Sequence, residues 1–233
     1  MDTITMPYRL VTPQASSMSS FVDSVAFGER KIASLSSTFP LPLEETMTLS
    51  TLLGSKLHRN GRELLQSITP GVSNSSLVIS QSAVTRGIPA SLALTQTPLQ
   101  HESPFKVCSS TSEIVRTFSE NLHPNTSPLC WNVNQACMVT PPFPNIFAPR
   151  IAADGFVVDG YTRPKNGRVN QTSVLSRVET NSGIAGMLLS LVQWAKKVDI
   201  SKRHAFLESG IEVESFKEML EELTSLSQRY ENP

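Results

Sequence analysis

The stretch "SSTSEIVRTFSENLHPNTSPLCWNV", residues 109–133, places a helical pattern directly before a strand pattern. Ser110 and Glu113 have the spacing of a capping box, and Pro124 ends the helix. The apolar positions on one side of this helix are Ile114, Val115, Phe118 and Leu122. The positions that then alternate with polar residues are Leu129, Trp131 and Val133. Since the two periods differ, the stretch predicts an α+β fold.

Short elements on both sides of this stretch extend the same interpretation. Residues 50–68 have a helical pattern that Asn60-Gly61 kinks or divides, and three short apolar runs predict strands. These runs are residues 76–80, 90–97 and 104–109. Two further β-rich runs, 155–162 and 168–179, flank "RPKNG" and predict a β-hairpin. We therefore expect a single mixed domain with short strands and a β-hairpin, over residues 46–180.

Residues 1–45 precede this core and predict an irregular N-terminal arm. Serine clusters alternate there with scattered Phe and Val, and a Pro-Leu-Pro turn follows. Residues 20–35 fit a short helix and a flexible extension equally well. The proline-rich stretch "CMVTPPFPNIFAPR", residues 137–150, is interpreted as a joint between two regions, because proline ends a strand ladder. Its P-x-x-P pattern leaves a docking peptide as the alternative.

Residues 181–233 predict a C-terminal helical region. The run "GIAGMLLSLVQWAKKVD", residues 183–199, is apolar around more than one side, and a second helix follows with its own apolar seam. The seam residues are Val213, Phe216, Leu220, Leu223 and Tyr230. A helix that is apolar over more than one stripe needs more than one neighbour. The β-rich core and a second subunit are equally good candidates for that neighbour.

The amino-acid composition restricts the classes of protein to which this chain can belong. The 233 residues carry 20 basic and 20 acidic side chains, so the net charge is zero, which argues against a globally basic nucleic-acid binder. The three cysteines contain no C-x-x-C pair and indicate free thiols in a reducing compartment. No secretory signal and no apolar run long enough to cross a bilayer are evident. We expect a soluble, intracellular, cytoplasmic protein.

No catalytic, cofactor or metal site emerges from the residues. Asp154 and Asp159 are five positions apart and would point to opposite faces of a strand. The histidines stand singly, and no phosphate loop, nucleophile elbow or dinucleotide fingerprint is present. Cys108 near His101 or His123 is more typical of a packed core than of a catalytic pair. The sequence therefore predicts a protein that is not an enzyme and has no cofactor.

Two surfaces remain as functional candidates, and no resemblance to a known family accompanies them. The leading hypothesis is a non-enzymatic self-assembling or interaction subunit of a viral coat, matrix or accessory type, part of a virion. The residues expected to mediate self-association are Met187, Leu188, Leu191 and Trp194. The alternative is RNA or other nucleic-acid binding through a basic hairpin tip and a C-terminal basic cluster. The residues of this alternative are Arg163, Lys165, Arg168, Lys196, Lys197, Lys202 and Arg203.

Overall fold

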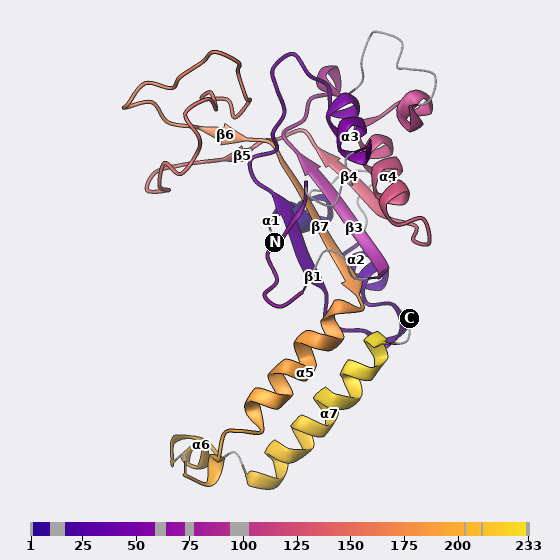
Figure 1. The fold of residues 1–233 in the computed structure, drawn as a ribbon, viewed down its shortest axis with the longest axis vertical. Coiled ribbons are helices and arrows are strands. Elements are labelled where there is room, and N and C mark those ends of the chain that lie inside the picture. Colours follow the sequence, from indigo (N-terminus) through magenta and orange to yellow (C-terminus); the bar gives the residue numbers. More distant parts are fainter. Residues whose placement is uncertain are drawn as a thin grey trace.

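The computed structural model describes residues 2–9, 17–58, 64–72, 77–93, 103–202, 204–210 and 212–231 (Figure 1). The chain has an α+β fold. Its helices are α1 (Asp2–Arg9), α2 (Met18–Val25), α3 (Leu49–His58), α4 (Thr111–Leu122), α5 (Gly183–Ala195), α6 (His204–Glu208) and α7 (Val213–Glu231). Its strands are β1 (Ser34–Thr38), β2 (Gln66–Ser67), β3 (Val78–Arg86), β4 (Leu129–Val133), β5 (Cys137–Met138), β6 (Gln171–Thr172) and β7 (Val174–Asn181). The 3-10 helices are η1 (Phe27–Glu29), η3 (Ala90–Leu92), η4 (Pro104–Val107) and η5 (Ile200–Lys202).

A mixed five-stranded sheet, in the order β2-β1-β7-β3-β4, forms the centre of the molecule. The neighbours β3 and β7 are antiparallel, β4 runs parallel to β3, and β1 pairs antiparallel with β7. All eight residues of β7 are buried, because helices cover both faces of the sheet. The strand predicted at residues 76–80 falls largely within β3, and the predicted strand after α4 is β4.

Helices α3 and α4 cover one face of the sheet. The side chain of Ser110 accepts the Glu113 amide at 3.3 Å and caps α4 as the sequence predicts. Ile114 and Phe118 of α4 and Leu53 of α3 are buried with Phe105 and Leu175 in one core. The predicted helix 50–68 is shorter than expected: α3 ends at His58, residues 59–63 lie outside the described residues, and Gln66–Ser67 is strand β2.

Helices α1 and α2 cover the other face of the sheet. The prediction that residues 1–45 form an irregular arm is therefore wrong for these helices. Ile4 and Tyr8 of α1 and Phe21 and Val25 of α2 are buried against the sheet. The Tyr8 hydroxyl also accepts a hydrogen bond from Trp131 Nε1 at 3.1 Å. Residues 34–38, inside the predicted arm, form β1. Packing against distant strands therefore orders a segment that looks irregular by composition alone.

Two further predicted strands are 3-10 helices. Residues 90–92 form η3, residues 104–107 form η4, and residues 94–102 lie outside the described part of the chain. The side chain of Ser103 accepts the Phe105 amide at 3.4 Å, which caps η4 and turns Phe105 into the core. This local cap, together with Pro104 at the first position, favours a turn over an extended strand.

A small two-stranded antiparallel sheet is present, but it does not join the runs 155–162 and 168–179 as the sequence predicts. Residues 137–172 instead form a small lobe beside the sheet, where β6 pairs with β5 and the core consists of Phe147, Ile151, Val157 and Val169. Gly155 has φ +91°, and a Cβ there would lie 2.4 Å from the Gln171 carbonyl oxygen. That close approach and the positive φ require glycine, and the run after residue 173 pairs as β7 with β1 and β3 instead. The proline-rich stretch 137–150 lies within this lobe, where it contains β5 and contributes Phe147 to the core, so it is not the predicted joint between two regions.

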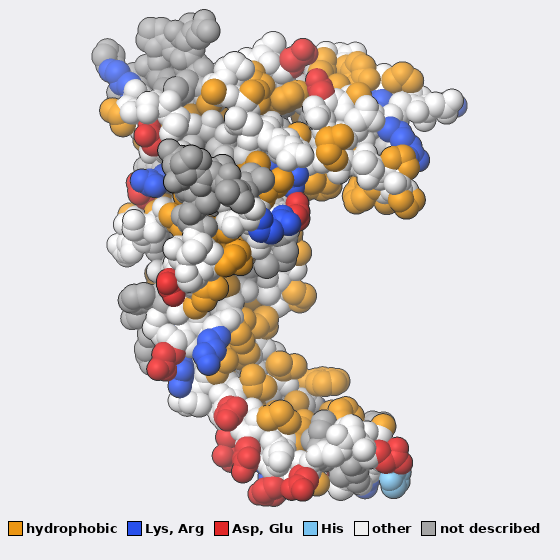
Figure 2. Space-filling view, turned by 180° about the vertical axis from the view of Figure 1, so that it is seen from behind, with side chains coloured by type: hydrophobic (Ala, Val, Ile, Leu, Met, Phe, Trp, Pro, Cys, Tyr) orange, Lys and Arg blue, Asp and Glu red, His pale blue; other side chains and the backbone are white. Residues whose placement is uncertain are grey.

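Helices α5 and α7 form an antiparallel helical hairpin that projects from the end of the sheet, immediately after β7 (Figure 1). The lobe projects from the opposite end of the molecule. Seen in the space-filling view, the lobe, the body and the helical hairpin outline a C (Figure 2). The predicted helices of the C-terminal region are confirmed, and they stand away from the body over most of their length.

Candidate protein-contact surface on the C-terminal helical hairpin

The base of the helical hairpin is fixed to the body by a small core and by hydrogen bonds. The core residues are Val72, Ile184, Ala185, Leu188 and Tyr230, which are all buried. The Tyr230 hydroxyl accepts the Ile32 amide at 2.7 Å and donates to the Ile32 carbonyl at 2.9 Å. Arg30 Nε donates to the Arg229 carbonyl at 2.7 Å. The orientation of the projecting helices is therefore set by packing, not by a free linker.

One side of the helical hairpin is apolar and open to solvent. Leu191 (48% exposed) and Trp194 (66%) on α5 and Met219 (45%) on α7 are among the large exposed hydrophobic side chains. Half-buried neighbours extend the surface. We call the apolar face the set Met187, Leu191, Trp194, Met219, Leu223 and Leu226. Figure 2 shows hydrophobic side chains continuing from the body onto the helical hairpin, with acidic side chains along its outer margin.

Helical spacing explains why these residues share a side. On α5 the positions 187, 191 and 194 are related by i, i+4 and i+7, and on α7 the positions 219, 223 and 226 repeat the same spacing. Each stripe lies beside the buried seam through which the two helices contact each other. Two parallel stripes of three apolar side chains therefore form one surface.

Charged residues border this surface unevenly. Lys197 follows Trp194 by three residues, whereas Glu218 and Glu222 lie on the α7 margin next to Met219. Glu222 is three residues after Met219 and four before Leu226, so it shares their side of the helix. The α5 margin is therefore basic near the tip of the helical hairpin, and the α7 margin is acidic at the same level.

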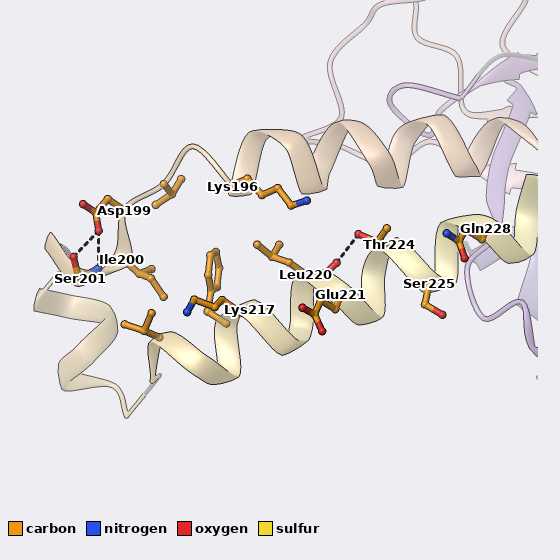
Figure 3. A pocket seen from close by; sticks show the side chains of 13 residues that line it. Lys196, Asp199, Ile200, Ser201, Lys217, Leu220, Glu221, Thr224, Ser225 and Gln228 are labelled. Carbon is orange, nitrogen blue, oxygen red and sulfur yellow. Dashed lines mark hydrogen bonds between the residues drawn. The ribbon is translucent and has the colours of Figure 1, made fainter.

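A groove lies between α5, α7 and the segment that connects them (Figure 3). Its volume is about 660 Å³, and its apolar lining residues are Val198, Ile200, Val213, Phe216 and Leu220. Lys217 also lines the groove and precedes Met219 by two residues, which is about half a turn of helix. The groove and the apolar face are therefore separate surfaces.

The polar groups around the groove do not converge as they would in a catalytic centre. Asp199 accepts hydrogen bonds from the Ser201 amide (3.2 Å) and hydroxyl (2.5 Å) and pairs with Lys202 at 3.0 Å. These contacts, Ser201 first, lower the pKa of Asp199. Its carboxylate is thus held in a local turn. The lining of the groove combines apolar side chains with a few polar ones at its rim.

The structure places the predicted self-association residues on two different sides of α5. Met187, Leu191 and Trp194 lie together on the apolar face. Leu188 is only 2% exposed and packs in the base core. The prediction that Leu188 takes part in self-association is therefore corrected. Met219 and Leu226 were not predicted, although their i, i+7 spacing with Leu223 between them is visible in the sequence.

The basic residues of the alternative hypothesis are not brought to one face. Lys165 and Arg168 are exposed on the lobe, whereas Lys196, Lys197 and Lys202 lie at the tip of the helical hairpin, at the other end of the molecule (Figure 1). Arg163 has a structural role, donating to the carbonyls of Phe147 (2.8 Å) and Ile151 (3.1 Å). Arg203 lies outside the described residues. Nucleic acid as a partner stays an untested prediction.

The remaining chemical candidates stay dispersed. Cys108 is buried with its Sγ 3.3 Å from the Thr117 hydroxyl, and His101 lies outside the described residues. Among the residues described above, no group of three or more His, Cys, Asp or Glu side chains could hold a metal ion. The described helices also include none with the length and hydropathy needed to cross a membrane.

Comparison with known proteins finds similar proteins in several animals. No family model matches the chain. It is 27% identical over 235 residues to protein misato homolog 1 of Bos taurus and 27% identical over 234 residues to that of Homo sapiens, in each case 99% of this chain. It is 26% identical over 240 residues to protein misato of Drosophila melanogaster. The chain spans about 40% of the length of each of these relatives.

These relatives correct the leading functional hypothesis. Proteins of cattle, human and fruit fly match nearly the whole chain, so the hypothesis of a viral coat, matrix or accessory protein is wrong. The composition that suggested it, neutral charge with many serines, threonines and prolines, has another explanation in this structure. Several of the prolines lie in the irregular connections of the lobe, and serines and threonines occupy polar positions of β1, β3 and β7.

Proposed function

We propose that this chain is a protein-docking region of a misato-type protein, and that the apolar face of its helical hairpin is the contact surface. The observation that carries the proposal is the exposure of Leu191, Trp194 and Met219 side by side on an element that projects from the body. Full burial of such a side chain contributes about 1.5 to 3 kcal/mol relative to its exposure in water. A partner that covers all three recovers enough free energy to offset part of the cost of association.

The proposal includes a non-catalytic role and a cytoplasmic location. The region supplies a binding surface and takes no part in bond making, which is consistent with the dispersed polar groups around the groove. Cys108 and Cys130 are buried free thiols, and burial raises the pKa of Cys130 to about 12. Free thiols in the core suit a reducing compartment. Self-association through the C-terminal helices is one form that this docking can take.

Site-specific photo-crosslinking tests the docking role. A photoreactive amino acid replaces Trp194 on the apolar face, and in a matched control it replaces Val107, which is 86% exposed in η4 on the body. In eukaryotic cells we expect a discrete crosslinked protein product from position 194 and none of that mass from position 107. Mass spectrometry then identifies the product. Equal product patterns from the two positions, or no product from position 194, would contradict the proposal.

A further inference from the structure

We infer that the partner covering the apolar face is a second copy of this chain, and that the two helical hairpins form a four-helix bundle with their tips at the same end. This inference rests on the docking function proposed above and names its partner. Each copy would use the same surface, as in other two-fold symmetric dimers. Two helical hairpins packed face to face are a common way to build a four-helix bundle.

The spacing of the apolar residues fits this arrangement. A two-fold axis along the helical hairpin places α5 of one copy over α7 of the other. Met187, Leu191 and Trp194 span seven residues, about 10.5 Å of helix, and Met219, Leu223 and Leu226 span the same length. Because α5 and α7 are antiparallel, Trp194 and Met219 lie toward the tip, and Met187 and Leu226 toward the base. The stripe on each α5 therefore meets the stripe on the partner's α7 at matching levels.

The charges at the margins favour the same arrangement. With the tips together, Lys197 of one copy approaches Glu218 and Glu222 of the other, twice by symmetry. With the tips at opposite ends, a two-fold axis would place α5 over α5 of the other copy, and Lys197 would lie away from Glu218 and Glu222. The pairing of Lys197 with Glu218 and Glu222 therefore supports the arrangement with the tips together. Lys196 and Lys217 line the groove and do not take part.

Charge reversal in the full chain, followed by size-exclusion light scattering and sedimentation, tests this interface. Wild-type protein should form a dimer whose fraction rises with concentration. Lys197→Glu alone, and Glu218→Lys with Glu222→Lys, should each raise the dimer dissociation constant at least about tenfold, since each creates a like-charge contact at two symmetric places. Lys217→Glu, on the groove side of α7, is the matched control and should leave that constant unchanged.

A mixture of the two reversed proteins provides the decisive comparison. Opposite charges face each other again in the mixed dimer, so it should form at concentrations where each variant alone is monomeric. All of the changed residues are exposed, and circular dichroism should confirm that each variant is folded. Monomeric wild-type protein at every concentration, or failure of the mixture to associate, would overturn the inference. Crosslinks from position 194 to a different protein would overturn it as well while upholding the docking function.

Discussion

At the scale of single residues, Tyr230 determines how the helical hairpin is held. Its side chain is fully buried, and its hydroxyl exchanges two hydrogen bonds with the backbone of Ile32. Those bonds join the last turn of α7 to the segment before β1, nearly 200 positions earlier in the chain. Sequence periodicity identified Tyr230 as an apolar seam position, but it could not reveal this distant backbone partner.

The first prediction concerns this contact. Tyr230→Phe leaves the amide and carbonyl of Ile32 without the hydroxyl and should lower the free energy of unfolding by about 1 to 3 kcal/mol at neutral pH. Burial raises the pKa of Tyr230, so the unfolded chain ionises first as the pH rises past 10. The stability that Tyr230 provides is therefore present below pH 10 and lost above it.

Denaturant titrations of both proteins from pH 7 to pH 11.5 measure this effect. The stability difference between wild type and Tyr230→Phe should shrink above pH 10 as the wild-type advantage is lost. Tyr8 also has a raised pKa, but it is present in both proteins and cancels in the difference. A difference that stays constant across this range would show that the Tyr230 hydroxyl does not titrate as described.

A buried ion pair on β7 could not be predicted from the sequence around it. Arg177 and Glu179 lie on β7 with their charged atoms 2.7 Å apart and their side chains about 3% exposed. In the sequence, "RVE" looks like the polar side of a half-buried strand. Only the sheet order, with β7 between β1 and β3, shows that both sides of this strand are covered.

At the scale of elements, local sequence signals predicted α4, α5 and α7 but not α1. The Ser110 cap, the apolar seam of α4, and the 3.6-residue pattern of α5 and α7 are all encoded within a dozen neighbouring residues. The predicted β-hairpin failed because β6 pairs with β5 and β7 pairs with β1 and β3, all distant in sequence. Non-local pairing overrode the local Asn-Gly signal.

The second prediction separates the two sides of α5. Leu188 is buried in the base core and Leu191 is 48% exposed on the apolar face. Leu188→Ala should lower the free energy of unfolding by about 2 to 5 kcal/mol, because it leaves a cavity. Leu191→Ala should change it by less than about 0.5 kcal/mol when the protein is dilute.

Chemical unfolding at low protein concentration distinguishes these outcomes, since dilution removes any contribution of association to stability. At high concentration Leu191→Ala should become the more informative variant, because it weakens the proposed dimer. Equal losses of stability for Leu188→Ala and Leu191→Ala in dilute solution would mean that the monomer covers the apolar face.

At the scale of the whole molecule, the helical hairpin and the lobe stand at opposite ends of a covered sheet (Figure 1). Sequence reasoning recognised that residues 183–199 carry more apolar surface than one neighbour can cover, but it grouped Leu188 with Met187 and Leu191 and set Trp194 on another side. It left open whether the β-rich core supplies the cover. The structure shows that the body covers only the base of the helical hairpin, through Val72 and Ile32, because α5 leaves the body after its first turns.

The candidate site could therefore be predicted in part. The α5 stripe follows from spacing alone. The α7 stripe and its acidic margin can be assigned to the same surface only when the packing of α5 and α7 is known. Their antiparallel packing places Trp194 and Met219 at the same level. The separation of the two basic clusters could not be predicted either, because it depends on the lobe and the helical hairpin extending in different directions.

Hydroxyl-radical footprinting of the apolar face tests the central claim most directly. Trp194 and Met219 are readily oxidised, and Met138 on the lobe, 56% exposed, serves as an internal control. In concentrated protein or a eukaryotic cell extract, Trp194 and Met219 should be oxidised more slowly in wild type than in Leu191→Glu, with Met138 equal in both. Equal oxidation of Trp194 and Met219 in the two proteins would show that nothing docks on this face and would contradict the account.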